Sequence, residues 1–294
     1  MPFVAAPPVF TLIARRNASH EAWWYALPRR RNLASAFKQG VREHPLRFFF
    51  PLAFLLSWYP TLLSFVGVRA SGINPLGVLA AALIVSGLAG GRPGVTVLLR
   101  RMIRVRVGLR WYAVALLLPA CFAFLSLGLT LIFGARLPAH EQWANWPGIV
   151  DHFLIMFLFV GLGEEPGWRG FALPELQKSR SGLESAMLVG VAWALWHIPL
   201  MGTEFRWNNV PAFLLSVFAG SVVAAWLFNS AKESVLLCML FHASVNAVTS
   251  GYVFPLFGDA DLTRLWWIYA LVWVAGAAAI AWRSGPALRS GARS

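Results

Sequence analysis

The sequence predicts an all-α, polytopic membrane protein with about eight transmembrane helices. Hydrophobic residues make up 58% of the 294-residue chain, and charged residues only 13%, whereas a soluble domain carries about 25% charged residues. Long apolar runs recur along the chain, and a helix of about 20 such residues crosses the hydrocarbon core of a bilayer. The distribution of basic residues between these runs is a third, independent indication. Together these observations exclude an ordinary soluble fold.

Eight apolar runs are the predicted membrane spans. Residues 1–45, which precede them, are mixed in polarity and are predicted to form a basic cytoplasmic tail, partly disordered or lying on the membrane surface near Trp23. Residues 46–284 then form one transmembrane domain, and residues 285–294 form a second cytoplasmic tail. The runs are 47–66, 75–90, 111–133, 148–165, 184–200, 210–229, 234–250 and 265–282.

The basic residues support this parse of the chain. If the N-terminus is cytoplasmic and every run crosses the bilayer, 21 Lys and Arg residues fall on the cytoplasmic side and four on the other side. This asymmetry follows the positive-inside rule, so both termini are predicted to be cytoplasmic and the protein integral to the cell's inner membrane. The net charge of +13 then reflects topology and anionic lipid headgroups rather than nucleic-acid binding.

Two segments between the runs are predicted to be amphipathic helices at the membrane interface. In segment 91–110, apolar residues alternate with arginines, which is typical of a helix that lies in the interface. Segment 167–178 is the second candidate. No internal repeat is present, so the sequence does not favour an inverted-repeat transporter.

Adjacent carboxylates end the fourth run. Glu164 and Glu165 are followed at a spacing of four by Arg169, and ionisable groups inside a span are costly and mark functional sites. Because Pro166 disfavours helix at the residue before it, the span is predicted to end at Glu165 and a new helix to begin. One carboxylate would face a cavity as a general base, while Arg169 neutralises the other. The alternative is that the pair marks a helix end at the headgroups.

Two later runs carry histidines. Trp193 lies four residues before His197, and His242 lies four residues before Asn246, so each pair shares a helix face. The alternative to a functional role for His197 is that of a buried histidine that is hydrogen-bonded to a carbonyl. For His242 and Asn246 the alternative is that they form hydrogen bonds between helices. The rise per residue places these groups and Glu164 about 8 to 20 Å from the cytoplasmic face. They are therefore predicted to meet in one cavity.

The ordered set of motifs resembles the CPBP family, which comprises type II CAAX prenyl endopeptidases, bacteriocin-processing enzymes and related bacterial membrane proteins. The resemblance covers about residues 150–250, and the stretch 163–171 is especially similar to bacterial members. Trp193 departs from the pattern, because many members carry Phe there. The motifs are Glu164-Glu165-x-x-x-Arg169, Trp193-x-x-x-His197 and His242-x-x-x-Asn246.

The resemblance implies a membrane-embedded endopeptidase. Glu164 and His197 would activate water, whereas His242 and Asn246 would hold the oxyanion. Glu165 and Arg169 would be supports, and Arg169 is also a candidate for contacting a substrate carboxylate. No metal is preferred; the alternative is catalytic Zn²⁺ held by Glu164, His197 and His242, although no His-Glu-x-x-His motif is present.

The resemblance implies a peptide or protein substrate at the bilayer, with a cavity that opens to the cytoplasm. The arginine-rich, lysine-poor composition favours a bacterial source, so leader or bacteriocin processing is favoured over cleavage of prenylated CAAX proteins. Two other function classes stay open. One is a non-catalytic membrane scaffold or bacteriocin-immunity protein that uses the same cavity. The other is a transporter or ion channel, against which the absence of repeats counts. The sequence predicts no oligomeric state.

Overall fold

A computed structural model describes residues 33–70 and 72–290, and these residues contain helices and no β-strand. The predicted surface-lying segment near Trp23 and residues 291–294 lie outside the described part. The chain divides into two units, Met1–Gln39 and Gly40–Ser294. Helix α2 (Leu33–Glu43) spans the boundary between them. All features discussed below belong to the second unit.

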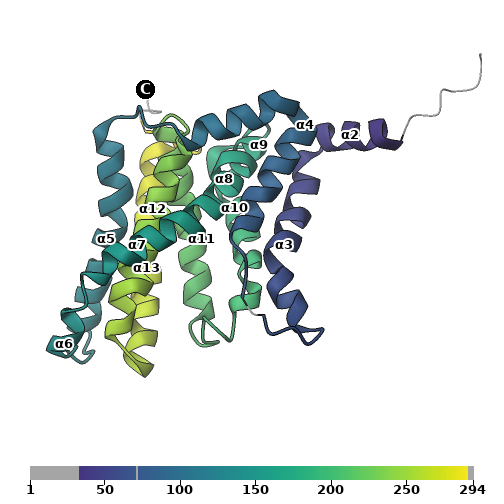
Figure 1. Cartoon of the computed structure of the whole chain (residues 1–294). Helices are drawn as coiled ribbons and strands as arrows, with labels where there is room; N and C mark the ends of the chain where they lie inside the picture. The colour runs from purple at the N-terminus through teal and green to yellow at the C-terminus, as the bar shows by residue number, and fades with distance from the viewer. Residues whose placement is uncertain (1–32, 71, 291–294) are drawn as a thin grey trace, which may run out of the picture. The chain divides into compact units, whose positions relative to one another are not determined.

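Each of the eight predicted runs corresponds to helical structure, so the polytopic all-α prediction is confirmed (Figure 1). Among the described residues, six helical segments are long and apolar enough to cross a membrane. The fourth run is divided by π-helical turns, and α10 has only 15 residues, so the count of eight is approximate. The main helices are α3 (Pro45–Ser64), α4 (Leu76–Met102), α5 (Leu109–Ile132), the short α6 (His140–Trp143), α7 (Gly148–Met156), α10 (Gly182–Trp196), α11 (Val210–Ser230), α12 (Val235–Val248) and α13 (Asp259–Ser284).

The fourth run does not end at Glu165, so that prediction is wrong. Pro166 lies inside α8, and helical structure continues without a break to Gln177. The physical reason is that π-helical turns flank α8 and change the spacing of the backbone hydrogen bonds, so a ring without an N–H is accommodated. Segment 167–178 is likewise not a separate surface helix, because its first six residues are mostly or fully buried. The successive elements are α7, η1 (Phe157–Gly161), α8 (Leu162–Gly167), η2 (Trp168–Ala172) and α9 (Leu173–Gln177).

Two glycines bring this helix close to its neighbours. A Cβ atom on Gly161 would lie 2.9 Å from the carbonyl oxygen of Met239 in α12. A Cβ atom on Gly163 would lie 2.7 Å from the carbonyl carbon of Pro75, at the start of α4. Because these neighbours are backbone atoms, they cannot move aside as a side chain can. Glycine at these positions therefore sets the distance between α8 and the two helices that flank it.

Gly163→Ala is expected to lower the free energy of unfolding by about 1–3 kcal/mol, the usual cost of overpacking a tight contact. Thermal unfolding of the purified protein in detergent measures the effect. Gly128→Ala in α5 is the matched control, because a Cβ atom there meets nothing within 4 Å. Equal midpoints for the two variants would contradict the close approach of α8 to α4.

Helix α4 bends sharply at Gly91, where φ is 61° and ψ is −154°. The positive φ suits glycine, which carries no Cβ. The chain then turns helical again up to Met102, and Figure 1 shows this second part running across the end of the bundle. The helix expected within segment 91–110 is thus present. Its location at the membrane interface stays a prediction.

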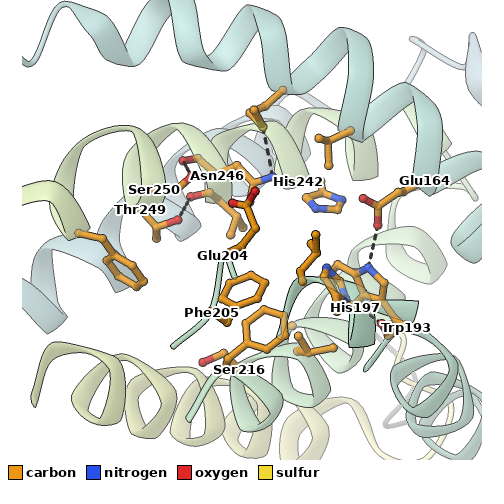
Figure 2. Close-up of a pocket in the computed structure, with 18 of the residues that line it drawn as sticks. Glu164, Trp193, His197, Glu204, Phe205, Ser216, His242, Asn246, Thr249 and Ser250 are labelled. Carbon is orange, nitrogen blue, oxygen red and sulfur yellow. Dashed lines mark hydrogen bonds between the residues drawn. The ribbon is translucent and has the colours of Figure 1, made fainter. Parts of the chain in front are cut away.

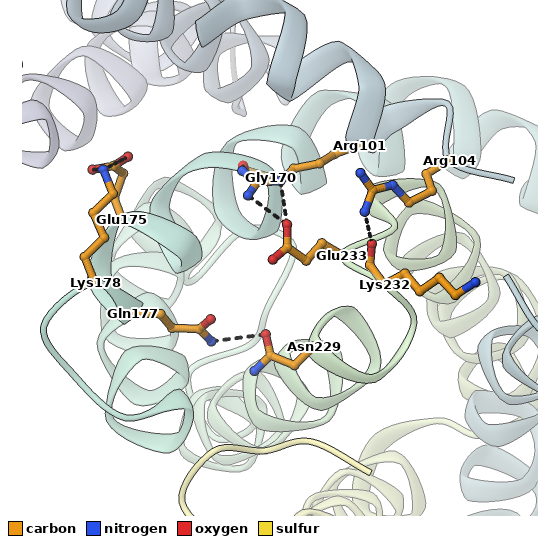
Figure 3. Close-up of polar contacts among 9 residues, drawn as sticks. All are labelled: Arg101, Arg104, Gly170, Glu175, Gln177, Lys178, Asn229, Lys232 and Glu233. Atoms are coloured by element: carbon orange, nitrogen blue, oxygen red, sulfur yellow. Dashed lines mark hydrogen bonds and ion pairs between the residues drawn. The ribbon is translucent and has the colours of Figure 1, made fainter. Parts of the chain in front are cut away.

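Two arginines at the end of α4 fasten it to neighbouring elements (Figure 3). Arg101 donates to the carbonyl oxygen of Gly170 at 2.9 Å and forms an ion pair with Glu233 at 2.8 Å. Arg104 donates to the carbonyl oxygen of Lys232. Lys232 and Glu233 form the turn between α11 and α12 with positive φ values of 55° and 60°. The two arginines thus stabilise a tight turn and tie it to η2, which carries part of the site.

Candidate functional site

A cavity of about 820 Å³ lies among the helices of the second unit, and all the candidate residues line it (Figure 2). Its walls come from α8, η2, α10, α11, α12 and the elements next to them. The predicted convergence of the three motifs in one cavity is therefore confirmed. The residues brought together are Glu164, Glu165, Arg169, Trp193, His197, His242 and Asn246.

The Glu164 carboxylate is held at one oxygen and open at the other. Its side chain is on α8 and only 2% exposed. Trp193 donates its indole N–H to Oε2 at 2.7 Å, and Trp168 donates to the same oxygen at 3.3 Å. Figure 2 shows the other carboxylate oxygen turned towards the ring of His242. Oε1 accepts none of the hydrogen bonds found among the described residues, so it is the oxygen available to a ligand in the cavity.

Glu165 has a different environment from its neighbour. Its Oε1 accepts from Arg169 Nη1 at 2.8 Å and lies 2.7 Å from His242 Nδ1. Glu165 and Arg169 are each 1% exposed. The prediction that Arg169 neutralises one of the two carboxylates is therefore confirmed, and that carboxylate is Glu165. Two buried carboxylates and one guanidinium leave one negative charge, which an imidazolium at His242 would balance.

Trp193 connects these groups. Its ring lies 4.6 Å from the guanidinium carbon of Arg169, a cation–π distance. Its centroid is 5.3 Å from the ring of His242 and 5.6 Å from that of His197. The same side chain donates to Glu164, as described above. A phenylalanine could reproduce the ring contacts but not the N–H donor, so the departure from the family pattern adds a hydrogen bond to the site.

The hydrogen bonds of the two histidines restrict their proton positions. His197 caps the end of α10, and its Nδ1 lies 2.8 Å from the carbonyl oxygen of Trp193. A carbonyl only accepts, so Nδ1 carries the proton and the Nε2 of the neutral ring has a free lone pair. The carbonyl bond of the alternative interpretation is thus present, but the ring also lines the cavity. His242 directs Nδ1 to a carboxylate, which leaves its Nε2 for the cavity.

Asn246, His152 and Glu204 also line the cavity, whereas Trp168 is fully buried and contacts the site through Glu164. The amide nitrogen of Asn246 lies 3.6 Å from the Met156 sulfur, a weak contact. The sequence interpretation missed the contact between Trp168 and Glu164. These two residues are four apart, the same spacing as Glu165 and Arg169. His152, from α7, is part of this lining. So is Glu204, which lies between α10 and α11 where no spacing signal exists.

The cavity does not extend towards the arginine-rich end of the bundle. Its lining includes residues from the segments between α3 and α4, between α10 and α11, and between α12 and α13. The charge distribution predicts that these segments lie outside the cytoplasm. A cavity opening to the cytoplasm is therefore incompatible with the predicted topology, and one of the two expectations is wrong.

Metal binding was the alternative for Glu164, His197 and His242. The three side chains line one cavity, but the described residues contain no group of three or more His, Cys, Asp or Glu side chains arranged to hold a metal ion. The residues as they lie do not fit a zinc site.

Comparisons with known proteins agree with the motif pattern. Residues 145–248 match the profile of the family described as type II CAAX prenyl endopeptidase Rce1-like. The chain is 26% identical over 152 residues to CAAX prenyl protease 2 of Methanococcus maripaludis. That alignment covers 48% of this chain and 56% of the relative, so the chain spans little more than half the length of the protein it matches. Residues 145–248, the segment that matches the family, contain all three motifs.

Proposed function

We propose that this chain, a member of the CPBP intramembrane protease family, is an endopeptidase that hydrolyses a peptide bond of a membrane-associated protein or peptide. The observation that carries the proposal is the pair of environments at Glu164 and Glu165. One oxygen of Glu164 is open to the cavity, whereas Oε1 of Glu165 is bound by Arg169 and His242 and its Oε2 is buried without a partner among the described residues. The relative's name, CAAX prenyl protease 2, supports the same reaction class.

Water is activated by Glu164 and His197 in this proposal. The open oxygen of Glu164 accepts a proton from a water molecule while the oxygen of that water attacks the carbonyl carbon of the substrate. The free lone pair on Nε2 of His197 offers a second acceptor for the same water. Trp193 and Trp168 fix the carboxylate by donating to its other oxygen. The protonated Glu164 then returns the proton to the leaving amine.

The negative charge that develops on the carbonyl oxygen is stabilised by His242 and Asn246. An imidazolium at His242 donates from Nε2 into the cavity while its Nδ1 is held by Glu165. Asn246 supplies an amide N–H from the next turn of α12. Donors that are already oriented are worth about 10²–10³ in rate each. We assign Arg169 to the support of Glu165, because the residue is 1% exposed and its Nη1 donates to that carboxylate, while Nε and Nη2 have no partner among the described residues.

The test is to find the peptide whose terminus changes. Membrane and secreted peptides from cells with the wild-type chain are compared with those from cells that express Glu164→Ala. The proposal predicts at least one terminus that is present only with the wild type. That peptide is then incubated with the purified protein in liposomes. If it stays intact there under all conditions, the proposed activity is refuted.

Trp193→Phe is expected to lower kcat about 10-fold with little change in KM. The reason is that one hydrogen bond to a charged group is lost, worth about 1.5–3 kcal/mol, while Trp168 keeps its bond to the same oxygen. Because Trp193 acts through Glu164, the pH profile of kcat should also change. Trp146→Phe is the control, since Trp146 is 61% exposed and is not one of the residues that line the cavity. Equal kinetics in both variants would refute the positioning role.

Cleavage is expected to persist after treatment with a metal chelator, because the proposed chemistry uses side chains alone. The measurement is the initial rate of peptide cleavage before and after incubation with 1,10-phenanthroline. A loss of activity that added Zn²⁺ restores would instead support the zinc alternative, with Glu164, His197 and His242 as its ligands.

A further inference from the structure

The cavity reaches the connecting segments at one end of the helix bundle, and its lining includes none of the described connecting segments at the other end. From Glu164 and His242 it extends past segments that join α3 to α4, α10 to α11 and α12 to α13. Figure 1 shows these three connections at the same end, opposite the second part of α4. Residues of these segments that line the cavity are Gly72, Ile73, Glu204, Phe205, Pro255 and Phe257. No lining residue comes from segments 91–110, 178–181 or 231–234.

The two ends of the bundle differ in charge. The end away from the cavity mouth holds the arginines of segment 91–110 and the basic residues Lys178, Arg180, Lys232, Arg283 and Arg289. The end with the mouth holds four arginines and five carboxylates. Basic residues near spans are retained on the cytoplasmic side. The positive-inside rule therefore places the mouth of the cavity outside the cytoplasm.

A carboxylate stands at this mouth. Glu204 is exposed, forms none of the ion pairs found among the described residues, and points into the cavity in Figure 2. Aromatic side chains form the wall beside it. Phe205 stacks on Phe213 with ring centroids 3.9 Å apart, and Phe213 packs on Trp266 at 6.0 Å. An apolar wall with one unpaired acid suits a peptide segment that carries apolar residues and a cationic group.

We propose that the cavity receives its peptide from the extracytoplasmic side of the membrane, and that Glu204 favours segments with a basic residue near the cleaved bond. That the bound peptide is a substrate rests on the proposed peptidase function. The direction from which the cavity is reached does not depend on that proposal. The substrate class is an exported or outward-facing peptide rather than a cytoplasmic protein terminus. We therefore keep the topology that the basic residues predict and abandon the expectation that the cavity opens to the cytoplasm.

Cysteine labelling tests the direction of access. Cys121 is exposed and Cys238 is buried, so Cys121→Ser is the parent, and it must remain unlabelled. Glu204→Cys in this parent should react with a membrane-impermeant maleimide in spheroplasts, and Arg106→Cys should react only in inside-out vesicles. Trp207→Cys, at a side chain 70% exposed beside Glu204, replaces the first variant if that one fails to fold. The reverse labelling pattern would overturn the inference.

Labelling needs no hydrolysis, so it also works in a Glu164→Gln background. A chain that is labelled as expected but cleaves nothing would refute the proposed function and leave the access direction intact. A chain that cleaves peptides but is labelled at position 204 from the cytoplasmic side would refute the access direction and leave the proposed function intact.

The preference for a cation is tested with two peptides that differ only by Lys or Gln next to the cleaved bond. Glu204→Gln should raise KM for the Lys peptide about fivefold, as expected for one exposed ion pair, and leave kcat and the Gln peptide unchanged. Glu141→Gln is the matched control, because Glu141 is exposed at the same end but does not line the cavity. Equal effects on both peptides, or none on either, would refute the role of Glu204.

Discussion

Glu164→Gln is expected to lower kcat for peptide cleavage by about 10³-fold, within the range of contributions from general acid–base catalysis. Glutamine has nearly the same shape and can still accept the indole N–H of Trp193. It cannot take a proton from water, because a neutral amide is not a base near neutral pH. The substitution also removes a buried charge, so the fold is retained. Initial rates in liposomes and the unfolding midpoint in detergent measure the two effects.

Asp151→Asn is the matched control for this loss of a carboxylate. Asp151 lies on the same run, in α7, but is exposed and absent from the cavity lining. Its substitution should leave the rate unchanged. Wild-type cleavage by Glu164→Gln would rule out Glu164 as the base. A partner-binding or immunity phenotype that survives this substitution, with no cleavage by the wild type, would favour the non-catalytic scaffold.

Arg169→Met is expected to lower the free energy of unfolding by about 3–5 kcal/mol, the cost of removing one partner from a buried ion pair. Methionine fills a similar volume, so packing against Trp193 is largely kept. Glu165 is 1% exposed in the wild type, so the substitution removes the guanidinium from a buried carboxylate whose remaining partner is His242. Unfolding in detergent by heat or denaturant measures the change.

Lys178→Met provides the comparison for this ion pair. Lys178 pairs with Glu175 at 2.6 Å, but its side chain is 68% exposed, and such pairs contribute about 0–1 kcal/mol. The double variant Arg169→Met with Glu165→Gln should recover part of the lost stability, because the unpaired charge is then gone. If Arg169→Met and Lys178→Met unfold at the same midpoint, the pair with Glu165 does not stabilise the site.

Much of the fold and the identity of the site residues followed from local patterns in the chain. Apolar runs predicted the helices because a span must bury its backbone polar groups in a continuous helix. Glu164, His197 and His242 stood out because ionisable groups inside apolar runs are costly. The spacing predicted that Arg169 neutralises one of the two carboxylates, and the structure shows that it pairs with Glu165, four residues earlier in the same helical segment. These features depend on short stretches of sequence, and so they could be recognised there.

The remaining features depend on how distant helices pack. Pro166 continues the helix because π-helical turns beside it accommodate the ring, and no single-residue rule anticipates that compensation. Glu165 and His242 are 77 residues apart, yet they share a hydrogen bond. Glu204 reaches the cavity from a connecting segment without a motif. Sequence spacing reports neighbours along one helix, whereas contacts between helices, and the end at which a cavity opens, arise from the packing of whole elements.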